Sequence, residues 1–455
     1  MVRCSGWTAT SRGEAPYTPL NEFVRYFDSE PNNNKNYPEK RSGHRCFTDN
    51  DYFYMIGGYC TNKGGQNVTG HILKELWVMS LVTFEWRRYE VRGSFPDSLA
   101  SFALVQLAPF SNSILLFGGS GTHFGVSSSN TLYLVRVNNE ECFATSEELQ
   151  VEGEPPNPIY GHAMCAGEVS GKYYIVGGTE GTIFNFDVTS VTMQLGTDAN
   201  GEKKTTWHYK KVSMNEEYAG RYRLEVVYDE LLSNLIFFGG GNGDEVFGFD
   251  KLIAMNVRTN VTEEIAATPD QVHGFPKARR CHTLVRHNRN VIITGGVRIG
   301  FQLSEEVYSD VWVFDLDTFA WTKLIYSLPE KVFFHDSVMT RDGWFLTFGG
   351  VNGTENGLRN NMLCGAWFDV PRLQRFAIER LRHSNPKLLS GLYCGNFRLS
   401  NALDIVMVFL KKGKVEEKEK HIIAQSKIKF YEEVDRSRHY LNENAENYMI
   451  GGVRS

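Results

Sequence analysis

Six Gly-Gly pairs, each preceded by a short run of aliphatic or aromatic residues, recur along the chain and constrain its fold more than any other feature. The first glycines of the pairs are Gly57, Gly118, Gly177, Gly239, Gly295 and Gly349. Successive first glycines lie 61, 59, 62, 56 and 54 residues apart. A period near this length with strand-like runs is typical of a propeller array, in which each repeat forms one four-stranded blade. The repeat therefore replaces the roughly three separate domains that chain length alone would suggest.

Each repeat carries two further features. A bulky side chain, aromatic or imidazole except at Leu224, precedes each pair by 13–16 residues: His44, Phe102, His162, Leu224, His282 and His335. A second strand, a tight turn and an aromatic residue follow the pair, as at Trp86, Trp207 and Trp321. We interpret the glycines as strand ends where backbones crowd, and the tryptophans as filling between blades. Both features predict that these residues build a ring of blades and have no catalytic role.

This pattern resembles the kelch repeat over residues 35–368. The resemblance implies an all-β fold, a six-bladed kelch β-propeller, followed by a short α-helical box. The sixth unit lacks an obvious fourth strand, and residues 21–27 are apolar and aromatic enough to supply it. Such closure would leave no exposed sheet edge. We expect an N-terminal tail at 1–20, the propeller at 21–368, the helical box at 369–400 and a charged C-terminal tail at 401–455.

Composition argues against several classes of protein. The formal net charge is −5, so there is no basic surplus for binding a phosphate backbone, and we expect no nucleic-acid partner. No apolar run approaches the roughly 20 residues that span a bilayer, and the N-terminus lacks the apolar core of a secretory signal. The eight cysteines are scattered without a CxxC pair, which favours free thiols in a reducing compartment. We expect a cytoplasmic protein without a membrane partner, with the nucleus as a second location.

The start of each unit's first strand supplies the candidate binding residues, because kelch rings bind through loops on one face and these positions point towards the channel. They hold Ser42, Ala100, Tyr160, Tyr222, Arg280 and Phe333, followed by Gly43, Ser101, Gly161, Arg223, Cys281 and Phe334. Two guanidiniums among aromatic rings suit an extended peptide whose terminal carboxylate is held by Arg. The residues leave open that these arginines pair with acidic neighbours or stack on aromatic rings.

Several runs resemble one group of kelch proteins in particular, namely RSGHRC at 41–46, IYGHAM at 159–164 and GFPKARRCH at 274–282. Members of this group serve as substrate receptors of cullin-2 ubiquitin ligases and recognise C-terminal degrons that often end in Gly or Ala. The resemblance implies that Arg223 and Arg280 hold the degron carboxylate. It also implies that Tyr160, Tyr222 and Phe333 flank the last side chain, with Ser42 at the same opening. Some relatives place arginines in the loop after a Gly pair, where the candidate here is Arg298.

Four of the repeated bulky residues are histidines and raise the question of a metal: His44, His162, His282 and His335. Each belongs to a different unit at the same strand depth, so the repeat accounts for them as packing residues. We expect no metal and no cofactor.

The segment after the ring has helical spacing, with Leu373, Ala377 and Leu381 on one apolar face. These residues match the apolar positions of an elongin-C-binding box, although Arg372 stands where the box has a small residue. The resemblance implies elongin B, elongin C and cullin-2 as partners, with Leu373 inserted into an apolar groove. The alternative is a helical pair that covers one side of the ring. Residues 411–420 carry eight charges, which is typical of a solvated helix or disorder.

Three classes of function compete. The leading hypothesis is a non-catalytic substrate receptor of a cullin-2 ligase. The alternative is a kelch scaffold that regulates a signalling phosphatase or a cytoskeletal partner without ligase assembly. A propeller enzyme, such as a radical-copper oxidase or a sialidase, needs a metal cluster or an Arg triad with a nucleophile and an acid. Neither is found at comparable loop positions in the sequence.

Overall fold

The computed structural model describes residues 22–27, 36–62, 69–122, 126–197, 201–212, 218–299, 305–353 and 358–369. The chain divides into two compact units, Met1–Pro371 and Arg372–Ser455, and every described residue belongs to the first. These residues form strands and turns without any helix, so none of them forms a helix that could cross a membrane. The predicted helical box, apart from Asp369, and the C-terminal tail lie outside the described residues.

The strands pair into four-stranded antiparallel sets, numbered one to six by their innermost strand. The innermost strands are β2 (Arg45–Thr48), β8 (Ala103–Gln106), β13 (Ala163–Ala166), β17 (Glu225–Asp229), β21 (Thr283–His287) and β28 (Asp336–Met339). The second strands are β3 (Tyr52–Ile56), β9 (Ser113–Phe117), β14 (Lys172–Thr179), β18 (Asn234–Phe238), β22 (Asn290–Thr294) and β29 (Trp344–Phe348).

The outer half of each set completes the sheet. The third strands are β6 (Leu76–Ser80), β10 (Leu132–Asn138), β15 (Phe184–Thr197), β19 (Lys251–Asn256), β25 (Asp310–Asp315) and β31 (Leu363–Trp367). The outermost strands are β7 (Trp86–Gly93), β11 (Phe143–Glu148), β16 (Lys203–Val212), β20 (Thr262–Ala266), β26 (Ala320–Ser327) and β1 (Val24–Phe27). Sets one and two share a sheet because β7 pairs in parallel with β11.

Seven short strands lie outside this scheme. They are β4 (Tyr59–Asn62), β5 (Thr69–Ile72), β12 (Val151–Glu152), β23 (Val297–Ile299), β24 (Glu305–Val307), β27 (Val332–Phe333) and β30 (Val351–Asn352). Strand β12 joins the edge of β16, and the other six pair with one another in twos.

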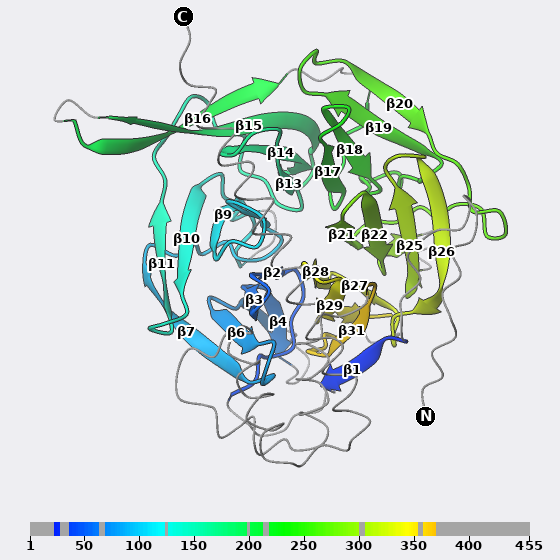
Figure 1. Ribbon diagram of the computed structural model, residues 1–455, viewed down its shortest axis with the longest axis horizontal. Coiled ribbons are helices and arrows are strands. Elements are labelled where there is room, and N and C mark those ends of the chain that lie inside the picture. The colour runs from blue at the N-terminus through cyan, green and yellow to red at the C-terminus, as the bar shows by residue number, and fades with distance from the viewer. Residues whose placement is uncertain are drawn as a thin grey trace, which may run out of the picture. The chain divides into compact units, whose positions relative to one another are not determined.

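The sets are arranged around a common centre, with their first strands inside and their last strands at the rim (Figure 1). Each innermost strand contacts the innermost strand of the next set, and β28 contacts β2. The hairpin of β15 and β16 extends beyond the rim (Figure 1). The predicted class, an all-β kelch-type propeller, is confirmed.

Set six combines the two ends of the propeller. We expected residues 21–27 to supply its outer strand, and β1 pairs antiparallel with β31, with Val24 opposite Gly365 and Arg25 opposite Cys364. Aromatic rings reinforce this pairing, since Phe23 meets Phe345 edge-on with ring centroids 5.6 Å apart. Tyr26 meets Trp344 in the same way, at 5.7 Å.

The Gly pairs pack against the repeated bulky residues of the neighbouring set. A Cβ on Gly118 would lie 2.7 Å from Cε1 of His162 in the next set. A Cβ on Gly349 of set six would similarly lie 2.8 Å from Cε1 of His44 in set one. Only glycine admits the neighbouring ring at such distances, and at φ of +64° and +65° it also avoids the strain of a Cβ. The repeat thus spaces its blades by fitting a side chain of one set under a glycine of the set before.

Candidate functional site

Six backbone hydrogen bonds form a closed ring at one end of the propeller. Each joins the residue two positions before an innermost strand to its equivalent in the preceding set, and we call these six residues the inner ring. The bonds run from Gly43 N to Phe334 O (3.0 Å), Ser101 N to Gly43 O (2.8 Å), Gly161 N to Ser101 O (2.7 Å), Arg223 N to Gly161 O (2.6 Å), Cys281 N to Arg223 O (3.3 Å) and Phe334 N to Cys281 O (3.1 Å). The propeller is therefore held closed here by its main chain, and side chains at this ring are held at fixed positions.

All six residues of the inner ring have a left-handed backbone, with φ between 56° and 66°. Gly43 and Gly161 adopt this conformation freely, whereas Ser101, Arg223, Cys281 and Phe334 carry a Cβ that makes it unfavourable. A non-glycine residue costs of order 1 kcal/mol in this region, and such strain clusters at functional sites.

Two further positions in each set complete the mouth around the inner ring. The middle positions pair with the residue that follows each Gly pair: Ser42, Ala100, Tyr160, Tyr222, Arg280 and Phe333. The outer positions pair with that same residue from its other side: Ile72, Ser128, Phe184, Val246, Val307 and Arg359. The mouth thus consists of three concentric rows of residues, and the predicted site residues other than Arg298 occupy the inner and middle rows.

Arg223 reaches across the mouth from set four. Its Nη2 donates a hydrogen bond to the Ser101 hydroxyl in set two. Its Cζ lies 4.4 Å from the ring centroid of Phe334 in set six. Burial lowers the pKa of Arg223, but the group stays charged because an arginine pKa is so high. The guanidinium therefore lies over the centre of the inner ring.

Arg280 and the tyrosines form the second part of the mouth. The Cζ of Arg280 lies 5.4 Å from the Tyr222 ring centroid, and its Nη1 donates to the Asn242 carbonyl oxygen at 3.3 Å. Tyr222 also meets Tyr160 edge-on at 6.3 Å, and burial raises its pKa to about 12. Aromatic stacking, one of the two alternatives left open by the sequence, is thus present for Arg223 and Arg280. Among the described residues neither one is ion-paired with a carboxylate within 4.0 Å.

The remaining predicted residues are more dispersed. Phe333 lies in β27 at the middle row, and its ring contacts that of Phe334 at 5.1 Å. Arg298 lies in β23 opposite Glu306, is exposed, and belongs to none of the three rows. Ser42 is buried in the middle row and accepts a hydrogen bond from Arg359 at 2.8 Å. The structure thus brings Tyr160, Tyr222, Arg223 and Arg280 together and leaves Arg298 apart.

A charged network closes the axis below Arg223. Arg45 lies 3.1 Å from Glu225 and 3.2 Å from Asp336, which belong to sets four and six. Burial raises the pKa of both carboxyls, while Arg45 opposes that shift. The axial cavity between this network and the inner ring measures about 20 Å³, room for about one water molecule. The axis at this level therefore has no room for a peptide chain.

Three arginines beside the mouth have structural roles that the sequence analysis did not assign. Arg41 and Arg279 are fully buried and donate to the first glycine carbonyls of their own units, Gly57 and Gly295, at 2.9 Å each. Each also binds a carboxylate, Glu75 or Asp310. Arg221 donates to the Gly239 carbonyl at 3.4 Å. These three arginines each lie one residue before a middle-row position, and this recurrence in the sequence could have indicated their shared structural role.

The repeated histidines do not gather at a metal site in the described part of the chain, where no group of three or more His, Cys, Asp or Glu residues lies close enough to hold an ion. Burial lowers the pKa of His162, His282 and His335 to about 3. These rings are neutral packing elements at physiological pH.

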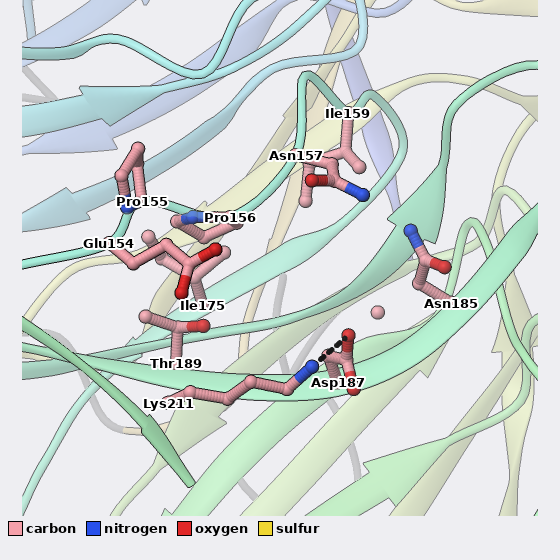
Figure 2. Close-up of a pocket in the computed structure, with 11 residues that line it drawn as sticks. Glu154, Pro155, Pro156, Asn157, Ile159, Ile175, Asn185, Asp187, Thr189 and Lys211 are labelled. Carbon is pink, nitrogen blue, oxygen red and sulfur yellow. Dashed lines mark hydrogen bonds and ion pairs between the residues drawn. The ribbon is translucent and has the colours of Figure 1, made fainter.

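A larger cavity of about 140 Å³ lies away from the inner ring, between the 154–159 connection and the strands of set three (Figure 2). Its lining is mixed, with an ion pair of 3.1 Å between Lys211 and Asp187, and with Pro155 and Pro156 along one wall (Figure 2). Its Lys211 and Asp187 are paired with each other, and it contains none of the cationic side chains of the mouth. We therefore place the candidate site at the mouth in spite of the difference in volume.

The sequence was compared with protein families and with known relatives, and the fold with solved structures. Residues 198–365 match the model of the KLHDC2/KLHL20/DRC7 Kelch-repeats domain. The chain is 34% identical over 357 residues to Kelch domain-containing protein 10 of Homo sapiens, covering 77% of this chain and 75% of that protein. It is 29% identical over 373 residues to the Kelch domain-containing protein 10 homolog of Drosophila melanogaster, covering 77% and 59%. The solved structure titled "Structure of YjhT" superposes with a TM-score of 0.48 at 14% identity, covering 72% of this chain and 95% of that one.

The resemblance found in the sequence is therefore confirmed, and it covers about three quarters of the chain. The chain belongs to the kelch-repeat family, in the group that contains Kelch domain-containing protein 10.

Proposed function

We propose that this kelch propeller is a non-catalytic substrate receptor that binds the C-terminus of a client protein at its mouth. Arg223 and Arg280 hold the terminal carboxylate, and Tyr160 and Tyr222 flank the last side chain, which is Gly or Ala. The observation that carries the proposal is a pair of half-buried arginines, Arg223 and Arg280, whose guanidiniums pack on aromatic rings with no ion-pairing carboxylate among the described residues. Arginines held in this way offer a fork of donors that matches a carboxylate.

The axial network favours a ligand that presents its chain end over one that presents a mid-chain segment. The cavity below the inner ring is too small for a peptide to continue inward, so a ligand that reaches Arg223 ends there. A chain end of any sequence brings a main-chain carboxylate to that position, whereas an internal loop would bring a carboxylate only on an Asp or Glu side chain. Small last residues fit because the inner ring is already occupied by the Arg223 and Phe334 side chains.

Amidation of a bound peptide's C-terminus is the direct test. A charge-assisted hydrogen bond contributes about 1.5–3 kcal/mol, so amidation should weaken binding at least tenfold. Fluorescence anisotropy of labelled peptides selected from a C-terminal library measures this. Equal affinity for the acid and the amide would exclude the carboxylate clamp.

We further propose that the receptor joins a cullin-2 RING ligase through elongin B and elongin C, in the cytoplasm with the nucleus as a second location. This step rests on Leu373, Ala377 and Leu381, which lie outside the described residues, and on the group to which the chain belongs. Leu373→Asp should abolish co-purification with elongin C, because a carboxylate cannot enter an apolar groove without a large desolvation cost. Retention of elongin C by this variant in a pull-down would favour the alternative, a scaffold for a phosphatase or a cytoskeletal partner.

A further inference from the structure

Arg359 occupies the outer row of the mouth, where it differs from its equivalents. The corresponding residues of the other sets are Ile72, Ser128, Phe184, Val246 and Val307, all uncharged. The repeat therefore accounts for the backbone at this position but not for a guanidinium. A charge at one of six equivalent positions points to a role specific to this side of the mouth.

The guanidinium of Arg359 is held by hydroxyl groups and a ring. Its Nε donates to Ser42 Oγ at 2.8 Å, and its Nη1 donates to Thr61 Oγ1 at 3.1 Å. Its Cζ lies 4.7 Å from the Tyr59 ring centroid. These contacts fix the group in place without neutralising it, since within the described part of the chain Arg359 is not ion-paired with a carboxylate within 4.0 Å. Burial already lowers its pKa, so an incoming anion would meet a partly desolvated cation.

Arg359 and Arg223 approach two adjacent residues of set one, Ser42 and Gly43. Arg359 donates to Ser42, while Nη2 of Arg223 lies 3.8 Å from the place of a Cβ on the adjacent Gly43. Consecutive Cα atoms are about 3.8 Å apart, and an extended peptide advances about 3.3–3.6 Å per residue. A ligand ending at Arg223 therefore passes Arg359 within its last few residues.

We propose that Arg359 forms a second anion subsite, which selects clients with an Asp or Glu side chain a few residues before the C-terminus. This proposal rests on the proposed function, since it assumes that a terminal carboxylate occupies Arg223 and Arg280. It assigns the ligand two negative groups, bound by guanidiniums in different rows of the mouth.

The test uses the full-length chain and a defined peptide series. Fluorescein-labelled decapeptides of Ser and Ala that end in Gly carry one Glu, placed in turn at the second to sixth residue from the end. Each has a matched Gln peptide, and each pair is made as the free acid and as the amide. Arg359→Gln removes the charge but keeps donors for Ser42 and Thr61, and Arg359→Lys restores the charge. Arg280→Gln is the matched control in the middle row, and thermal melting verifies that each variant is folded.

In the wild type we expect one position at which Glu binds about tenfold more tightly than Gln, as one charge-assisted hydrogen bond implies. Arg359→Gln should reduce that preference below about twofold and leave the penalty of amidation unchanged, and Arg359→Lys should recover part of the preference. Arg280→Gln should do the reverse, lowering the amidation penalty and keeping the preference for Glu.

Two results would overturn the second subsite while sparing the proposed function. One is an absence of any Glu preference together with a large amidation penalty. The other is loss of the amidation penalty in Arg359→Gln, which would make Arg359 part of the terminal clamp. Free acids and amides that bind alike would instead reject the proposed function, and the second subsite with it.

Discussion

Lowering the pH from 7 to 5 is expected to reduce the propeller's free energy of unfolding by about 6 kcal/mol. His162, His282 and His335 have pKa values of about 3 in the folded protein, because burial disfavours their charged form. In the unfolded chain the same side chains titrate near 6.5. Each histidine therefore lowers the free energy of unfolding by about 2 kcal/mol at pH 5. His44, whose pKa is also well below its usual value, adds to the effect. Domains are commonly stable by only about 5–15 kcal/mol, so this loss is large enough to unfold the ring.

The sign of this dependence follows from proton uptake. Between pH 6.5 and about 3 the unfolded chain binds more protons at these histidines than the folded chain does, so stability present above pH 6.5 is lost as the pH falls. Glu225 and Asp336 act in the opposite sense, because burial raises their pKa in the folded state. They therefore add stability as the pH falls, which opposes part of the loss from the more numerous histidines.

The chain contains its own control for this prediction. Set four has Leu224 at the histidine position, where it lies under Gly177 as His162 lies under Gly118. The triple variant His162→Leu, His282→Leu, His335→Leu should therefore still fold and should lose most of its stability change between pH 7 and 5. Urea unfolding followed by circular dichroism at pH 7, 6 and 5 measures the difference. An equal loss of stability in the wild type and the triple variant would show that other groups control acid unfolding.

The ring and much of its mouth could be predicted because they repeat at nearly constant spacing. The Gly pair and the side chain beneath it stay in step along the chain, and so do the middle and inner rows, which include Tyr222, Arg223 and Arg280. A position that pairs in the same way in every set leaves a periodic trace in the sequence. The structure adds what periodicity cannot show, namely the closed ring of backbone hydrogen bonds and the left-handed backbone at Arg223.

Arg359 could not be predicted in this way, because the loops after the Gly pairs differ in length. The outer-row residue follows the second glycine by 14 residues at Ile72, by 6 at Phe184 and by 9 at Arg359. The charged network on the axis could not be predicted from the sequence for a different reason. Arg45 meets Glu225 and Asp336, which are 180 and 291 residues away, and nothing in a single sequence pairs such distant charges.

Deleting residues 1–30 is expected to abolish cooperative folding of the propeller. The deletion removes β1 and leaves β31 as an exposed edge, with its outward backbone groups unpaired. Trp344, which is fully buried, loses the Tyr26 hydroxyl that accepts its indole N–H at 3.1 Å. Phe345, also fully buried, loses its edge-on contact with Phe23.

The damage from this deletion is not confined to set six, because that set closes the ring. Set six supplies the Phe334 carbonyl that accepts from Gly43 and the Asp336 carboxylate that binds Arg45, so its loss opens the inner ring and the axial network together. Deletion of residues 1–20 is the matched control, since it retains β1 and should melt like the full chain. Calorimetry of the three proteins tests the argument. If the chain without residues 1–30 shows the same melting transition as the full chain, β1 is dispensable and the ring is closed by the inner hydrogen bonds alone.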